Sequence, residues 1–124
     1  MNTHRIVDDA DRVVAFELDS VYAGVRKIAA LLRSVPGVEE VRVRRLFHRP
    51  ADVHIHFSFL GIDFILWEPY ADNSRYWIGP AQGIAEGVDI TILERRFQQY
   101  DPPWIVKLVG ALLSLQWRSG KLRA

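Results

Sequence analysis

Residues 53–67 read VHIHFSFLGIDFILW, which is two apolar runs on either side of Leu60-Gly61. In the first run every second residue is apolar, a period that is typical of a strand with one buried face. A turn at Leu60-Gly61 would fold the second run, Ile62 to Glu68, back against the first as an antiparallel strand. This register predicts four cross-strand pairs: Phe57 with Phe64, Ile55 with Leu66, His56 with Ile65, and His54 with Trp67.

The hairpin leads into residues 67–77, WEPYADNSRYW, where aromatic residues surround a set of turn formers. Arg75 to Gly79 is typical of a further strand, which Pro80 ends. With Pro69 to Ser74 as the loop, the predicted pairs are Glu68 with Arg75, Trp67 with Tyr76, and Leu66 with Trp77. Trp77 then belongs to the core, and the second sheet face carries Trp67, Tyr76, His54 and His56. Because that face is partly apolar, we expect helices or a bound partner to cover it.

The spacing of apolar residues predicts the other elements. Residues 41–48 alternate apolar and basic side chains, which favours a strand before the hairpin. Residues 18–32 repeat apolar side chains at spacings of three and four, which predicts a helix capped by Asp19 or Ser20 and ended by Pro36-Gly37. Residues 89–100 contain strand formers, but their apolar spacing favours a helix, and a last apolar helix follows Asp101-Pro102. The predicted fold is α+β, with an N-terminal helix, a four-stranded antiparallel meander and two C-terminal helices.

The composition is that of one globular domain spanning residues 1–124. Sixteen basic and fifteen acidic side chains leave a net charge of +1, too little to hold nucleic acid or an acidic membrane surface through a strong field. The most apolar segment, 105–115, is shorter than the roughly 20 residues that cross a bilayer. The chain has no cysteine, and Asp8, Asp9 and Asp11 stand where a signal peptide needs an apolar run. We expect a cytoplasmic protein that binds neither nucleic acid nor membrane.

Two groups of residues could carry chemistry. His54 and His56, with Glu68 or Asp52, could hold a metal ion, and the same histidines with Glu68 could form an acid and base pair. Because a clear third ligand, a nucleophile and an oxyanion site are missing, we expect no metal, no cofactor and no catalysis. The second group could bind single-stranded nucleic acid by charge and stacking, although Glu39 and Glu40 oppose this and a solvated strand edge is the favoured interpretation: Arg42, Arg44, Arg45, Arg49, Phe47 and His48.

The aromatic residues around the second loop are the strongest indication of function. A structural turn needs Asn and Ser, but it does not need two Trp and two Tyr beside them. Aromatic residues and Arg are typical of desolvated binding surfaces, although an aromatic-stacked hairpin core is an open alternative. The predicted partner-binding residues are Trp67, Glu68, Tyr70, Asp72, Arg75, Tyr76, His54 and His56.

The segment 67–77, together with the predicted order of elements in a small chain, resembles the small bacterial immunity proteins of contact-dependent inhibition and related toxin systems. The resemblance implies a cytoplasmic, non-enzymatic protein that binds a cognate toxin domain through a few aromatic and charged residues. Immunity proteins against nucleases are often acidic, and a net charge of +1 departs from that pattern. A secretion-type chaperone or scaffold subunit, and a small His-based metal protein or enzyme, are the alternatives.

Overall fold

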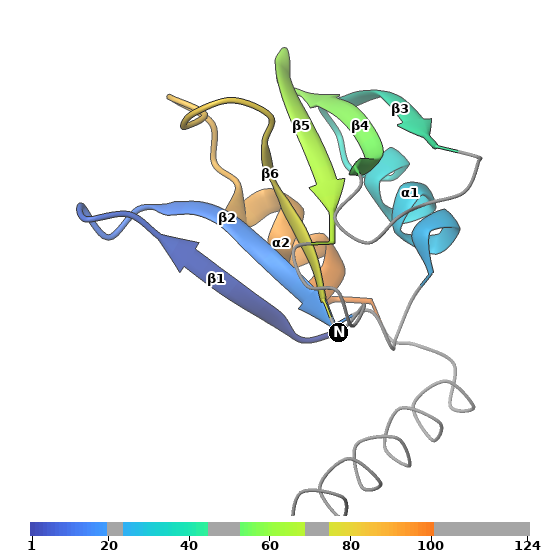
Figure 1. Ribbon diagram of the computed structural model, residues 1–124, viewed down its shortest axis with the longest axis horizontal. Helices are drawn as coiled ribbons and strands as arrows, with labels where there is room; N and C mark the ends of the chain where they lie inside the picture. The colour runs from blue at the N-terminus through green and yellow to red at the C-terminus, as the bar shows by residue number, and fades with distance from the viewer. Residues whose placement is uncertain (20–23, 45–52, 69–74, 101–124) are drawn as a thin grey trace, which may run out of the picture.

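The computed structural model describes residues 1–19, 24–44, 53–68 and 75–100. These residues form a six-stranded antiparallel sheet and two short helices (Figure 1). The strands lie in the order β1-β2-β6-β5-β4-β3. The elements in chain order are β1 Thr3–Val7, β2 Val13–Asp19, α1 Val25–Arg33, β3 Val38–Val43, β4 Val53–Phe59, β5 Ile62–Trp67, β6 Arg75–Pro80 and α2 Thr91–Gln98.

The predicted N-terminal helix is wrong for its first part, because the chain opens with the hairpin β1–β2. Leu18 and Asp19 belong to β2, and the helix begins only at Val25. The Asp-rich segment between the two strands is a turn, in which Asp8 Oδ1 accepts hydrogen bonds from the backbone N–H groups of Ala10 and Arg12 at 3.0 and 2.9 Å. Apolar and polar residues alternate only in the second half of β2, from Phe16 to Asp19, because its first half, Val13 to Ala15, is entirely apolar.

The four-stranded meander is also corrected, because it is one part of a larger sheet. The four predicted strands are consecutive neighbours, β3 to β6, but β2 pairs with β6 and β1 extends the sheet beyond it. The segment 89–100, for which strand and helix competed, contains the helix α2. The predicted last helix lies outside the described residues, as do residues 45–48 of the first of the four predicted strands.

The β4–β5 hairpin confirms three of the four predicted pairs. Phe57 lies opposite Phe64, Ile55 opposite Leu66 and His56 opposite Ile65. Leu60 and Gly61 both have positive φ, at 51° and 82°, which is the geometry of a tight hairpin turn. The fourth pair is wrong, since the register shifts between Val53 and Ile55 and Val53 lies opposite Trp67. His54 is the extra residue of this bulge, and the bulge turns its side chain away from the face predicted for it.

The β5–β6 register differs from the prediction by one residue. Trp67 pairs with Trp77 and Leu66 pairs with Ile78. Because side chains alternate along a strand, this single step exchanges the two faces of β6. Tyr76 and Ile78 are therefore buried in the core, whereas Trp77, which was predicted to be in the core, lies on the other face beside Trp67.

Both helices cover the same side of the sheet (Figure 1). The core between them and the sheet is mainly aromatic and aliphatic, and the Phe64 ring contacts the Phe57 and Phe59 rings at centroid distances of 5.5 and 5.8 Å. α2 is also fixed to β1 at the sheet edge, because the buried Glu94 carboxylate accepts hydrogen bonds from Arg5 Nε and Thr3 Oγ1, each at 2.7 Å. The largest fully buried apolar residues are Phe16, Phe59, Phe64, Phe97, Leu18, Ile28, Leu32, Ile55, Leu66, Ile78 and Leu93.

Candidate functional site

The side of the sheet opposite the helices is called here the open face, because no described helix packs on it. A row of side chains in cross-strand register runs across this face from β1 to β4. A second row lies beside the first, towards the β4–β5 turn. The first row is His4, Glu17, Trp77, Trp67 and Val53, and the second includes Ile6, Ala15, Gly79, Ile65, His56 and Arg42.

Two tryptophans form the centre of the open face. The Trp67 and Trp77 rings meet edge to face, with centroids 6.3 Å apart and planes at 68°, and both side chains are half-buried. Trp77 lies over Gly79, where an added Cβ would stand 2.5 Å from the ring and 2.9 Å from Ala15 Cβ. The small residues therefore provide the space that holds the Trp77 ring flat against the sheet.

A charged group lies next to the tryptophans at the end of β2 and β6. Arg75 contacts two carboxylates, with Nη1 at 3.5 Å from Glu17 Oε1 and Nε at 3.6 Å from Asp19 Oδ1. His4 Nε2 lies 3.1 Å from Asp19 Oδ1. The acidic partners of Arg75 are therefore on β2, and the predicted pairing of Arg75 with Glu68 is wrong. Tryptophan and arginine are among the residue types enriched at the energetic centres of protein interfaces.

A second polar group, called here the inner cluster, lies on the helix-covered side and consists of His54, Glu68 and Tyr76. His54 Nε2 is 2.9 Å from Glu68 Oε1, and the Tyr76 ring meets the His54 ring edge-on at a centroid distance of 6.1 Å. All three residues are buried, with 3%, 7% and 8% of their surface exposed. Burial, and then the nearby Glu68 carboxylate, raise the pKa of Tyr76 above its ordinary value of 10.0. Side chains this deeply buried do not offer an acid and base pair to a substrate.

The predicted site residues thus divide between the two sides of the sheet. Trp67, Arg75 and His56 lie on the open face, with His56 exposed opposite Ile65 and Arg42. His54, Glu68 and Tyr76 lie in the inner cluster, while Tyr70 and Asp72 lie outside the described residues. Sequence reasoning missed the open-face residues Trp77, Glu17, Asp19 and His4. The β-branched run at Val13-Val14, followed by Phe16 and Leu18 two residues apart, is the signal that could have revealed β2 and its carboxylates.

The paired-histidine metal site does not form. The bulge at His54 places it in the inner cluster while His56 is exposed on the open face, so the two imidazoles do not converge. Within the described ranges, no three or more His, Cys, Asp or Glu side chains are grouped as a metal ion would need. No helix in the described ranges is long and apolar enough to cross a membrane.

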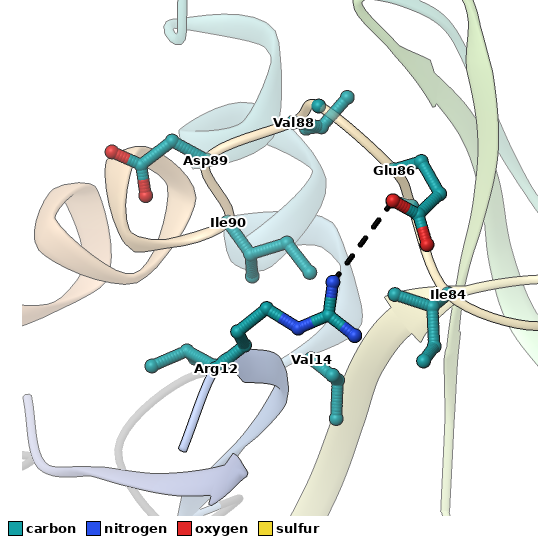
Figure 2. Close-up of a pocket in the computed structure, with 10 residues that line it drawn as sticks. Arg12, Val14, Ile84, Glu86, Val88, Asp89 and Ile90 are labelled. Atoms are coloured by element: carbon teal, nitrogen blue, oxygen red, sulfur yellow. Dashed lines mark ion pairs between the residues drawn. The ribbon is translucent and has the colours of Figure 1, made fainter. Parts of the chain in front are cut away.

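A small hollow lies at the start of β2, away from the tryptophans (Figure 2). It measures about 300 Å³ and is bordered by the β1–β2 turn and the segment 84–90. Arg12 reaches across it, with Nη1 3.9 Å from Glu86 Oε2, while its other amino group lies 2.9 Å from Asp8 Oδ2. Both acidic partners of Arg12 are solvent-accessible, and the remaining walls are largely aliphatic, so this hollow presents no set of side chains suited to a reaction.

Comparison of the chain with protein-family models, with curated proteins and with solved structures gave no match.

Proposed function

We propose that this chain is a non-enzymatic protein-binding domain that docks its partner on the open face. The observation that supports this proposal is the Trp67–Trp77 pair, which is half-buried on a side of the sheet that neither described helix covers. Scattered apolar residues on a protein surface need no explanation, but adjoining tryptophans do. Completing the burial of two indole rings would supply a large part of the free energy of a protein interface.

The surroundings of the tryptophans suit binding to a folded partner. Strand positions hold the rings rigidly, so little side-chain entropy is lost when a partner covers them. Arg75 is held by Glu17 and Asp19, and it presents a charged group next to the rings whose orientation is already fixed. A preformed hydrophobic centre with a polar border is the usual anatomy of a specific protein interface.

We further propose that the partner is a toxin domain, and that the chain is an immunity protein acting in the cytoplasm. Support for this narrower proposal comes from the segment 67–77 alone. The resemblance also rested on the predicted N-terminal helix and four-stranded meander, and those two predictions are wrong. Trp67 and Trp77, the two ends of that segment, are the residues that meet on the open face. An inhibitor of this kind needs affinity and no chemistry of its own, which fits an exposed aromatic centre.

The test is co-purification of the chain with the toxin domain encoded beside its gene, followed by calorimetric titration of variants. Trp67→Ala and Arg75→Ala should each weaken the complex by about ten-fold or more, since central aromatic and Arg residues dominate such interfaces. Gly79→Ala should also weaken it, because the new methyl group would displace the Trp77 ring from the sheet.

The matched control is Ile92→Ala, which removes an exposed apolar side chain from α2 on the opposite side of the sheet. Its affinity should equal that of the unchanged chain. If the open-face variants keep full affinity and cooperative unfolding, the docking surface lies elsewhere. A toxin that co-purifies but loses affinity only with the Ile92 variant would place the interface on the helices.

A further inference from the structure

The outer surface of the two described helices carries exposed charge of one sign. Every charged residue of α1 is basic, and the acidic residue of α2, Glu94, is buried against β1, where it accepts hydrogen bonds from Arg5 and Thr3. Both helices cover the same side of the sheet, so this surface lies on the side opposite the open face (Figure 1). We call it the basic helix surface, and its charged residues are Arg26, Lys27, Arg33, Arg95 and Arg96.

Helical spacing turns these side chains away from the sheet. Arg26, Lys27 and Arg33 lie on the arc of α1 that is opposite its buried residues, and all three are exposed. On α2, Arg95 is exposed, and Arg96 is half-buried on the side that faces α1. The buried residues that define the inner sides of the helices are Ile28, Ala29, Leu31 and Leu32 in α1 and Leu93, Glu94 and Phe97 in α2.

Two contacts join the helices into one continuous surface. Arg96 Nε donates a hydrogen bond of 2.8 Å to Ser34 Oγ at the end of α1, and Lys27 Nζ lies over the Tyr100 ring, 5.1 Å from its centroid. Both contacts hold a basic side chain in place and leave its charge unneutralised. Within the described part of the chain, none of the five basic residues forms an ion pair with a carboxylate. Positive charge therefore extends from α1 across to α2.

The net charge of +1 does not reveal this surface, because it averages over the whole chain. Acidic residues are concentrated at another place. Three aspartates lie in the β1–β2 turn, and Glu86 lies beside that turn, 3.9 Å from Arg12. The expectation that the chain binds no nucleic acid came from the net charge, and net charge says nothing about a local group of five cations.

The shortage of apolar groups on this surface selects among negatively charged ligands. On the two described helices, Ile92 is the one large apolar side chain that is exposed, because the apolar faces of both helices are used in the core. A helix that lies on a membrane needs an apolar face to insert, and a protein interface usually has an apolar centre that is depleted of charge. The basic helix surface provides neither of these.

A nucleic-acid duplex has the chemistry that fits this surface. Its phosphates present closely spaced negative charge and require no apolar contact. Four of the five cations are guanidinium groups, whose planar donors match phosphate oxygens in pairs. Single strands are usually held by bases stacked on aromatic rings, whereas Phe97 is buried and Tyr100 is half-buried next to Lys27. A duplex is therefore favoured over a single strand.

We propose that the basic helix surface is a second binding site, which takes the phosphate backbone of a nucleic-acid duplex without reading its sequence. The four guanidinium groups and the Lys27 ammonium pair with phosphate oxygens along the two helices. Phosphate contacts position a protein on a duplex, and they carry no sequence information by themselves. The site lies on the other side of the sheet from Trp67 and Trp77, so it extends beyond the function proposed above and does not depend on it.

The experiment measures the fluorescence anisotropy of a labelled DNA duplex of about 20 base pairs, two helical turns, as the full chain is added. Two duplexes of unrelated sequence should bind with equal affinity, because the contacts are to phosphates. Affinity should fall by about a hundred-fold between 50 and 200 mM salt, as expected for about four neutralised phosphates.

Matched charge removals assign the effect to the helices. Arg26→Gln and Arg95→Gln, one from each helix, should each weaken duplex binding by about ten-fold at 50 mM salt and reduce the salt slope by about one. Arg42→Gln removes the same charge from an exposed residue of β3, whose position opposite His56 places it on the open face, and should leave affinity unchanged. Far-ultraviolet circular dichroism and thermal unfolding establish that each variant is folded.

Three results would overturn the proposal. The first is the absence of duplex binding at 50 mM salt. The second is equal weakening by Arg42→Gln, which would show attraction to net charge alone. The third is tighter binding to vesicles that contain phosphatidylserine, or to polyglutamate, at the same concentration of negative charge, which would assign the surface to a membrane or to an acidic protein. Trp67→Ala should leave duplex binding intact, so failure here and failure of the open-face proposal are separate outcomes.

Discussion

The two sides of the sheet are made from the same strands, yet one side is buried and the other is partly exposed to solvent. On the helix-covered side, Phe64, Leu66 and Ile78 are completely buried, and the polar residues of the inner cluster contact one another. On the open face, the tryptophans are half-buried and the charged groups beside them have partial access to solvent. Since strand side chains alternate, one register step decides which aromatic residue of β6 belongs to which side. The difference shows how a side chain becomes available for binding without any change in composition.

The largest expected effect comes from truncating one aromatic ring on each side. Phe64→Ala should lower the free energy of unfolding by about 3–5 kcal/mol, because it leaves a cavity between Phe57 and Phe59. Trp67→Ala removes a larger ring but should lower it by only about 1 kcal/mol, since water already reaches that ring. Urea unfolding of the two variants measures both values. Equal losses would show that the open face is a second core and not a binding surface.

The next effect concerns the contact between His54 and Glu68 in the inner cluster. His54→Leu should lower the free energy of unfolding by about 3 kcal/mol, because it leaves the buried Glu68 carboxylate without the imidazole 2.9 Å away. The double variant His54→Leu/Glu68→Leu should recover part of that loss, since it leaves no buried charge. A complete double-mutant cycle by urea unfolding gives the coupling energy. A double variant that is less stable than His54→Leu alone would mean that these residues are held by other contacts and not by their pairing.

The features predictable from sequence were those set by local chemistry. Leu60-Gly61 fixed the register of the β4–β5 hairpin near the turn, and helical spacing identified α2. The bulge at His54 could not be predicted from the turn. The residues around it alternate between apolar and polar in the sequence, as they would in a strand without a bulge. The β5–β6 register could not be predicted from hydrophobicity, because each of the two possible registers places one aromatic residue of β6 in the core. Composition therefore does not distinguish Tyr76 from Trp77.

The missed N-terminal hairpin has a different physical origin. Leu18 extends the apolar spacing of α1 by coincidence, so a helical period appears to reach into a strand. In β2 only Phe16 to Asp19 alternate apolar and polar residues, whereas Val13 to Ala15 are all apolar, so the alternating part is too short to indicate a strand by itself. Without β2, the carboxylates that hold Arg75 could not be assigned. Of the residues grouped on the open face, Trp67 and Arg75 were among the predicted contacts, whereas Trp77 was assigned to the core and Glu17 and Asp19 were missed.

The smallest expected effect is the change of stability with pH that comes from Tyr76 in the inner cluster. Burial raises the pKa of Tyr76 above 10.0, and the Glu68 carboxylate raises it further, so the folded chain favours the neutral phenol. The unfolded chain ionises this group from about pH 10 upward. The contribution of Tyr76 to stability is therefore complete below pH 10 and is lost as pH rises towards the raised pKa of the folded state. The free energy of unfolding should fall by at most about 1.4 kcal/mol per pH unit, which is the limit for one proton.

Tyr76→Phe cannot ionise, so its stability relative to the unchanged chain should improve steadily from pH 9 to pH 11 in urea unfolding. Glu68→Gln should retain most of the alkaline loss, because burial is the larger cause of the raised pKa. Tyr100→Phe removes the same hydroxyl from a half-buried ring outside the inner cluster and provides the comparison. If Tyr76→Phe loses stability in parallel with the unchanged chain, the phenol is accessible to solvent. Tyr76 would then lie on the open face beside Trp67, as the one-residue register alternative requires.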